Sequence, residues 1–282
     1  APKRPGWRRH LVALTFLLSL ALLVIALARP TREEAAPLGP TLVLAIDTSL
    51  SMQATDVEPN RLEAAQEAAD ELVDSLAENV RVSLISFNGT ATIQVAPTTD
   101  HESVRDAIDS LELSEFTAIG EAIFASLDAI ELAEREQEAE AESDDEDDAE
   151  VEDPGSQVVV MSDGETTTGR PDVQAAQAAN EAGIEVSTIA FGTQGATIDI
   201  PGQGTVDVSV NEQALEAIAD STGGEFFAAT TGEELAEAFA DIGGTVDSEV
   251  IVREIGTWFL GLGVALLVLT SILSLLWFSR LP

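Results

Sequence analysis

The chain has 282 residues, of which 51 are Asp or Glu and 13 are Lys or Arg, and its formal net charge is −38. It contains no Cys, which excludes a disulfide framework and a cysteine-based metal site. Nucleic acid is excluded as a partner, because phosphate binding requires clustered Lys and Arg. All the acidic residues lie between Glu33 and Glu254, where the only basic residues are six Arg. The apolar residues, by contrast, are concentrated at the two ends of the chain.

The first apolar stretch is residues 11–28, which carry no charge and follow the basic residues of 1–10. A helix needs about 20 apolar residues to cross a bilayer. We therefore predict a transmembrane helix at 11–28 and, by the positive-inside rule, a cytoplasmic basic flank at 1–10. A cleaved signal peptide is the alternative, because Ala26-Leu27-Ala28 resembles a cleavage site. Since the chain begins with Ala, we also expect further residues upstream.

Residues 40–245 alternate between apolar, β-rich runs and helical patterns. The run at 41–46 is almost continuously apolar, as expected of a strand that is buried on both faces of a parallel sheet. Asn88-Gly89 is a strong hairpin signal, which predicts that strands at 81–87 and 90–95 pair antiparallel. The fold class is therefore predicted to be α/β, with a doubly wound, mostly parallel sheet and one antiparallel edge hairpin. Further strands are predicted at 158–161, 184–191 and 225–228, and helices at 61–77, 103–111, 119–132, 171–182, 213–219 and 233–242.

Residues 131–153 hold 14 acidic residues and one Arg. Self-repulsion and the scarcity of apolar residues predict a disordered insert, whose start extends the preceding helix. A calcium-buffering segment is the alternative to a solvated acidic loop.

The second apolar stretch is residues 256–279, which are uncharged, with Trp258 and Trp277 near the two ends. Its length and its aromatic ends predict a second transmembrane helix. Two spans would place residues 33–254 outside the cytoplasm.

Oxygen-bearing side chains follow two of the buried strands. Asp47, Ser49 and Ser51 come directly after the first strand, and Asp163 follows the strand at 158–161 within Ser-Asp-Gly. Thr117 opens the helix between them. Ligands bind at the carboxyl ends of the strands in open α/β sheets, and a hard divalent cation takes about six oxygen ligands. The residues therefore point to a cation site at this edge of the sheet.

These three motifs, in this order and spacing, resemble the von Willebrand factor A (VWA) domain with a metal-ion-dependent adhesion site (MIDAS). The resemblance covers residues 40–245. It implies that Ser49, Ser51 and Thr117 bind the metal through hydroxyls, and that Asp47 and Asp163 bind it directly or through water. The implied cofactor is a divalent cation, Mg²⁺ first, with Mn²⁺ and Ca²⁺ as alternatives. An open coordination position would accept a carboxylate from a partner protein.

Residues 52–62 and 96–100 resemble a narrower group, the membrane-anchored bacterial VWA proteins of the aerotolerance (Bat-like) and related actinobacterial families. These proteins have spans before and after the VWA domain, often with one more at the N-terminus. They are commonly associated with MoxR-type AAA+ ATPases and with other membrane VWA proteins. The resemblance implies a multi-pass protein of the cell membrane, with its VWA domain on the extracytoplasmic side. The acidic insert departs from the family pattern and leaves the partner open.

Two other classes compete with metal-dependent binding. A phosphohydrolase of the aspartyl-phosphate type generally has a second Asp where this chain has Ser49. His101 is predicted to be an exposed first-turn residue rather than part of a triad, and the only Lys is Lys3, so a P-loop is absent. The chain is therefore predicted not to be an enzyme. A structural or scaffolding envelope protein without metal is the other alternative.

Overall fold

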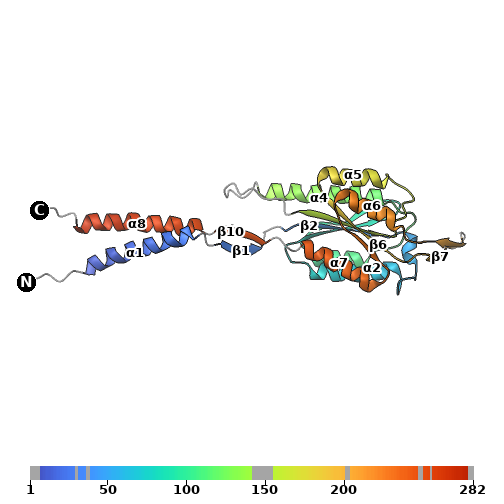
Figure 1. Cartoon of the computed structure of the whole chain (residues 1–282), viewed down its shortest axis with the longest axis horizontal. Helices are drawn as coiled ribbons and strands as arrows, with labels where there is room; N and C mark the ends of the chain where they lie inside the picture. Colours follow the sequence, from blue (N-terminus) through green and yellow to red (C-terminus); the bar gives the residue numbers. More distant parts are fainter. Residues whose placement is uncertain are drawn as a thin grey trace, which may run out of the picture. The chain divides into compact units, whose positions relative to one another are not determined.

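A computed structural model describes residues 7–28, 31–35, 39–141, 155–200, 204–246, 250–254 and 256–278 (Figure 1). The chain divides into two compact units. Residues 37–249 form one unit, and the two ends of the chain, 1–36 and 250–282, form the other.

The central unit is built on a six-stranded sheet with the strand order β4-β3-β2-β5-β6-β9. Every neighbouring pair is parallel except β3 and β4, which are antiparallel. This arrangement confirms the predicted α/β class, the mostly parallel sheet and the antiparallel edge hairpin. The strands are β2 (Thr41–Asp47), β3 (Arg81–Phe87), β4 (Ala91–Thr98), β5 (Ser156–Ser162), β6 (Glu185–Phe191) and β9 (Phe226–Ala229).

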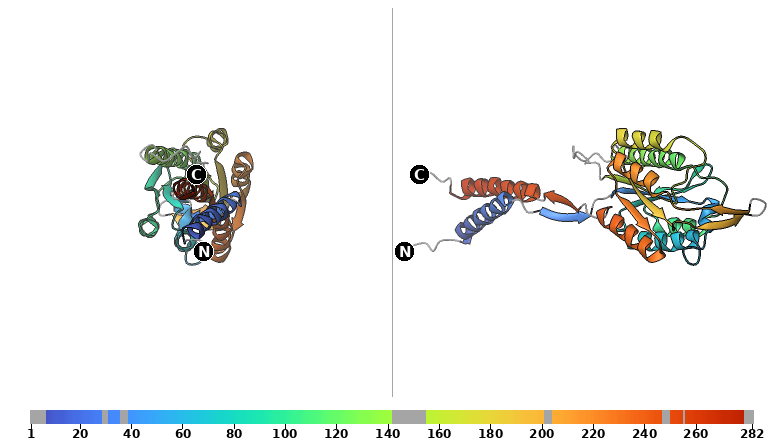
Figure 2. Two further views of the ribbon diagram at one scale, coloured as in Figure 1. Left: turned by 90° about the vertical axis from the view of Figure 1, so that its left-hand side faces the viewer. Right: turned by 45° about the vertical axis from the view of Figure 1, so that its right-hand side comes forward.

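Helices cover both faces of this sheet (Figures 1 and 2). Strand β2 is buried along its whole length: Leu42 and Leu44 join one apolar cluster, whereas Val43 and Ala45 join the other. This two-sided burial explains why the strand is continuously apolar rather than alternating. One face is covered by α2 (Arg61–Ser75), α3 (His101–Asp109) and α7 (Gly232–Val246), and the other by α4 (Ile119–Ala141), α5 (Asp172–Ala182) and α6 (Glu212–Thr222).

Helix α4 extends into the acidic insert, as predicted for the start of this segment. The helix continues to Ala141, so residues 131–141 are helical. Ala133 is buried, and its carbonyl accepts a hydrogen bond from Arg81 at 3.1 Å, which anchors this part of the helix to the sheet. Glu and Ala are also good helix formers. The rest of the insert, 142–153, lies outside the described residues.

A second hairpin was not expected from the sequence. Strand β7 (Thr197–Ile200) pairs antiparallel with β8 (Gly204–Asp207). Ile198 faces Val206 across the pair. Ile198 also joins a small apolar cluster with Ala54, Ala196 and Val208. Four-residue strands with only one or two apolar residues are too short for a period to show in the sequence.

The terminal unit pairs β1 (Thr31–Ala35) antiparallel with β10 (Val250–Glu254), which was also not expected. Helices α1 (Trp7–Leu27) and α8 (Gly256–Phe278) pack on each other. The Ser19 hydroxyl donates to the Gly263 carbonyl at 2.8 Å, and the Thr270 hydroxyl donates to that of Thr15 at 3.0 Å. Within the described part of the chain, none of the helices combines the length and the apolarity that crossing a membrane requires. The spans at 11–28 and 256–279 therefore stay predictions.

Candidate metal site and its cleft

The candidate site lies at the carboxyl ends of the two central strands. Asp47 is the last residue of β2, and Asp163 follows β5 directly. These strands are neighbours, and the sheet grows from β2 through β3 in one direction and from β5 through β6 in the other. This is the topological switch point, where open α/β sheets bind their ligands.

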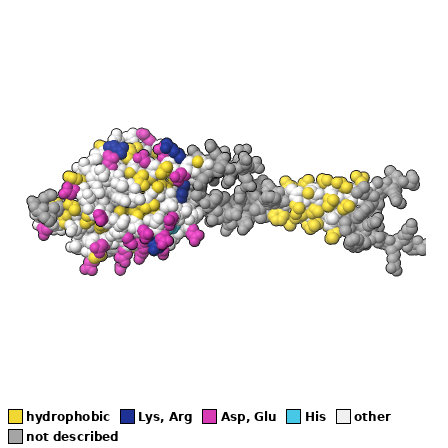
Figure 3. All heavy atoms as spheres, turned by 180° about the vertical axis from the view of Figure 1, so that it is seen from behind, with side chains coloured by type: hydrophobic (Ala, Val, Ile, Leu, Met, Phe, Trp, Pro, Cys, Tyr) yellow, Lys and Arg dark blue, Asp and Glu magenta, His cyan; other side chains and the backbone are white. Residues whose placement is uncertain are grey.

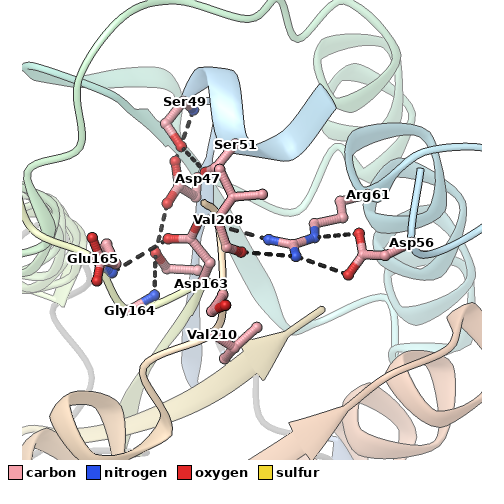
Figure 4. Close-up of polar contacts among 12 residues, drawn as sticks. Asp47, Ser49, Ser51, Asp56, Arg61, Asp163, Gly164, Glu165, Val208 and Val210 are labelled. Atoms are coloured by element: carbon pink, nitrogen blue, oxygen red, sulfur yellow. Dashed lines mark hydrogen bonds and ion pairs between the residues drawn. The ribbon is translucent and has the colours of Figure 1, made fainter. Parts of the chain in front are cut away.

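Asp47 is completely buried. Its Oδ1 accepts a hydrogen bond from the Ser49 backbone N–H at 2.8 Å (Figure 4). Its Oδ2 accepts one from the Ser162 hydroxyl at 2.5 Å. Burial, together with the nearby charge of Asp163, raises the pKa of Asp47 to about 7. The carboxylate is thus held in place by two donors, but its charge is poorly compensated.

Asp163 is also buried, and burial raises its pKa too, although a hydrogen bond from Ser51 and the charge of Arg61 oppose the shift. Its Oδ1 accepts from the Glu165 backbone N–H at 3.3 Å. Gly164 has φ +84, and a Cβ there would lie 2.4 Å from the Asn211 carbonyl oxygen. The Ser-Asp-Gly turn therefore requires its glycine.

Three hydroxyl residues complete the predicted set. The Ser49 and Ser51 hydroxyls lie 2.8 Å apart around the start of the short 3₁₀ helix η1 (Leu50–Gln53). The Thr117 backbone N–H donates to the Thr167 hydroxyl at 2.9 Å, which ties the loop before α4 to the loop after β5. Thr117 lines one cleft together with Ser49, Ser51 and Asp163. The structure therefore brings four predicted residues to one cleft, with Asp47 hydrogen-bonded to Ser49 at its edge.

Arg61 was not predicted as a site residue. Its side chain is completely buried at the start of α2, and it donates to both carboxylate oxygens of Asp56 at 2.8 Å (Figure 4). It also donates to the Val208 carbonyl at 3.0 Å. Its third nitrogen, Nη1, lies 3.6 Å from Asp163 Oδ2. Burial alone would raise the pKa of Asp56, but hydrogen bonds from Arg61 and Thr193 outweigh it and lower that pKa. No short sequence motif predicts a buried Arg at the first position of a helix.

His101 corrects a minor prediction. It does stand in the first turn of α3, but it is half-buried rather than exposed, and its Nε2 lies 2.9 Å from the Val80 carbonyl oxygen. It is not one of the residues that line the cleft.

The residues present fit a divalent cation. The site combines two buried carboxylates, both with raised pKa, with three hydroxyl residues, and these oxygen donors suit a hard cation. A bound cation would supply the positive charge that this pair lacks. Among the described residues, this site included, no group of three or more His, Asp or Glu side chains is placed to hold a metal. The site is therefore hydroxyl-rich rather than carboxylate-rich.

Comparison with known proteins agrees with this geometry. Residues 42–165 match the von Willebrand factor type A domain family. Over its whole length, the chain is 40% identical to a UPF0353 protein of Mycolicibacterium gilvum, and it covers 83% of that protein. The chain belongs to the UPF0353 family. The predicted resemblance to VWA proteins of actinobacteria is thereby confirmed.

The fold is similar to those of solved Bat-type proteins. BatB from Bacteroides thetaiotaomicron is 29% identical, with a TM-score of 0.60 over 75% of this chain and 100% of that one. An aerotolerance-related membrane protein from Bacteroides fragilis is 27% identical, with a TM-score of 0.60 over 73% of this chain and 100% of that one. Proximal thread matrix protein 1 of the mussel byssus, solved with a zinc-occupied MIDAS motif, shares only the fold, at 17% identity and a TM-score of 0.52 over 80% of this chain and 50% of that one.

Proposed function

We propose that this protein is a membrane-anchored VWA module that binds a partner protein through a divalent cation. The observation that carries the proposal is the buried pair of carboxylates, Asp47 and Asp163, beside three hydroxyl residues; Asp163 and the hydroxyl residues line one cleft, and Asp47 is hydrogen-bonded to Ser49. Two buried carboxylates with one partial countercharge are costly unless a cation joins them.

In this proposal Ser49, Ser51 and Thr117 hold the cation through their hydroxyls, and Asp47 and Asp163 hold it directly or through water. Mg²⁺ is the first choice, with Mn²⁺ and Ca²⁺ as alternatives. A bound cation supplies one Lewis-acid position to an incoming carboxylate. The chain's own residues orient the carboxylates: Ser162 and the Ser49 backbone donate to Asp47, and the Glu165 backbone donates to Asp163. No catalytic role is assigned to any residue.

The partner is a protein that presents an acidic side chain. Acidic residues greatly outnumber basic ones on the visible face of residues 37–249 (Figure 3). Without the cation, an acidic partner would be repelled by this surface. The family resemblance suggests a MoxR-type AAA+ ATPase system and other membrane VWA proteins as candidates.

Anchoring by spans at 11–28 and 256–279 is part of the proposal. Helices α1 and α8 expose large apolar side chains, for example Leu27 at 85%, and Leu14 and Leu275 at 67% each. Apolar surface on this scale is typical of a membrane or protein contact. The basic flank at 1–10 favours a cytoplasmic N-terminus, which puts the VWA domain on the extracytoplasmic side of the cell membrane.

A structural envelope protein without metal is the second candidate. One observation favours it: Arg61 already faces Asp163 at 3.6 Å, and a protonated Asp47 would need no cation.

Calorimetric titration of Mg²⁺ and Mn²⁺ into residues 37–249, a compact unit with its own core, separates the two candidates. We expect one saturable site that is lost in Asp47→Ala, weakened in Ser49→Ala and kept when residues 142–153 are deleted. If no saturable metal site is found, or if metal binding is lost when residues 142–153 are deleted, the result favours the structural envelope protein. Binding to an isolated partner should then be lost with chelator and in Asp47→Ala.

A further inference from the structure

We propose that the cleft beside the metal site is a docking surface for one kind of partner segment: a loop with an acidic residue, a neighbouring large apolar residue and flanking Lys or Arg. This proposal rests on the proposed metal-dependent binding and adds the chemistry of the partner. It follows from the shape, the apolar wall and the charges of the cleft.

The cleft has a volume of about 260 Å³ and lies between four segments. The loop after β2 and the loop before α4 contribute the predicted hydroxyl residues, and the loop after β5 contributes Asp163, Glu165 and Thr167. The β7–β8 hairpin and the residue after it contribute the remaining wall. Five apolar side chains line it around the polar centre: Leu50, Phe116, Ile198, Val206 and Val208. A carboxylate that reached the metal position would therefore bring its neighbouring residues against an apolar wall.

Phe116 is the most exposed of these apolar residues, at 60%, and it directly precedes Thr117. Its φ is +70, the only positive φ outside glycine in the described chain. A bulky residue in this region is uncommon and strained. The Glu115 carbonyl accepts from the Gly89 backbone N–H at 3.1 Å, and the Thr117 N–H is bonded to Thr167, so the backbone is fixed on both sides of the ring.

An exposed aromatic ring held on a fixed backbone loses little conformational entropy on binding, and aromatic anchors dominate protein interfaces. A glycine would relieve the strain at this position, but it would leave the cleft without its largest exposed apolar side chain. The ring therefore fits a role in contact with a partner better than one in folding.

The charges of the cleft determine what surrounds the apolar anchor. Glu115, Glu165 and Asp207 line it and are exposed, and none of them takes part in the ion pairs of the described residues. A uniformly acidic segment would be repelled by all three. A segment with one carboxylate for the metal and Lys or Arg beside it is complementary to the cleft. A second copy of this chain, with its net charge of −38, is the wrong partner on the same ground.

The test uses a phage-displayed library of random cyclic peptides, selected on residues 37–249 in Mg²⁺ and eluted with chelator. We expect the enriched peptides to combine one Asp or Glu, a large apolar residue, and Lys or Arg. Their affinity should fall at least about tenfold in Phe116→Gly, while Mg²⁺ binding measured by calorimetry stays unchanged. Phe116→Gly removes the strain of the positive φ, because glycine adopts this conformation freely, so the variant is expected to fold at least as well as the wild type. Val173→Ala, which shortens an 80% exposed apolar residue on α5, is the matched control and should bind the peptides as the wild type does.

Chelator-eluted peptides without basic or apolar enrichment, or equal binding to Phe116→Gly, would overturn this proposal and leave the metal site standing. Peptides that resist chelator, or Mg²⁺-dependent dimerisation through the cleft, would also overturn it. If the wild type binds no Mg²⁺, the proposed function fails, and this proposal fails with it.

Discussion

Arg61 Nη1 lies 3.6 Å from Asp163 Oδ2, while the other nitrogens of the same guanidinium are engaged by Asp56 and by the Val208 carbonyl. One buried guanidinium group thus lies close to the metal-site carboxylate of Asp163 and is shared with the carboxylate of Asp56. Nη1 itself makes no hydrogen bond. Arg61 therefore offsets the Asp163 charge only in part, which is consistent with the raised pKa of that residue.

Replacing Arg61 tests this arrangement. Arg61→Met would leave Asp56 without its bidentate partner and Asp163 without its nearest positive charge. We expect the free energy of unfolding of residues 37–249 to fall by about 3–5 kcal/mol without metal, as for the loss of one member of a buried pair. Urea unfolding measures this change.

Arg105 provides the control, because it also pairs with two carboxylates, Asp70 and Asp74, but with a side chain that is 41% exposed. Arg105→Met should cost less than about 1 kcal/mol. Equal losses in the two variants would contradict the idea that Arg61 compensates buried charge.

Gly192 provides a second test of how the Arg61 guanidinium is packed. Its φ is +126, and a Cβ there would lie 2.3 Å from Arg61 Cζ. Gly192→Ala should therefore combine backbone strain with displacement of the guanidinium, at a cost of about 3 kcal/mol or more. Gly195 has φ +77, and a Cβ there would have no atom within 4 Å. Gly195→Ala therefore measures the backbone strain alone, which is about 1–2 kcal/mol. Thermal unfolding of both variants gives the comparison, and a Gly192→Ala loss no larger than that of Gly195→Ala would refute the steric argument.

The sequence predicted the position of the two carboxylates at one edge of the sheet better than it predicted their surroundings. Asp47 and Asp163 follow strands whose continuous apolar runs are visible without a structure, and parallel strands end at one edge of a sheet. Arg61 was not predicted, because only the tertiary fold brings it beneath Asp163. The β7–β8 wall was not predicted, because its strands are four residues long and carry too few apolar residues for a period to show. The positive φ of Phe116 is likewise fixed by contacts with Gly89 and Thr167 that are remote in sequence.

The pH dependence of stability follows from Asp47. Its pKa is raised from its ordinary value of 3.8 to about 7, so between these values the metal-free native state binds a proton that the unfolded state has released. Stability must then fall as the pH rises through this window and level off above it. We expect residues 37–249 in chelator to be less stable at about pH 8 than at about pH 5.5, and Asp47→Asn to flatten this difference.

Denaturant unfolding at the two pH values measures the effect in wild type and variant. The contribution of Asp56, whose pKa is lowered, is fully present above its ordinary value of 3.8 and is lost as the pH falls below that value, so it is constant between the two pH values compared. The opposite result is a metal-free wild type that is more stable at the higher pH, with the same pH dependence of stability in Asp47→Asn. That result would show that Asp47 is ionised at both pH values.

The hydroxyl of Thr117 separates metal ligation from loop structure. Thr117→Ser keeps a hydroxyl and should keep Mg²⁺ affinity within a few-fold, whereas Thr117→Ala should lower it at least about tenfold, because a hard cation needs the oxygen. The backbone bond from Thr117 N–H to Thr167 survives in both variants, so the loop is held equally. Thr166→Ala removes a neighbouring exposed hydroxyl that donates to Asp172 at 2.8 Å and should leave Mg²⁺ affinity unchanged. Calorimetric titration of the three variants distinguishes the roles: parallel losses in Thr117→Ser and Thr117→Ala would mean that the methyl group, and thus packing, is what matters at this position.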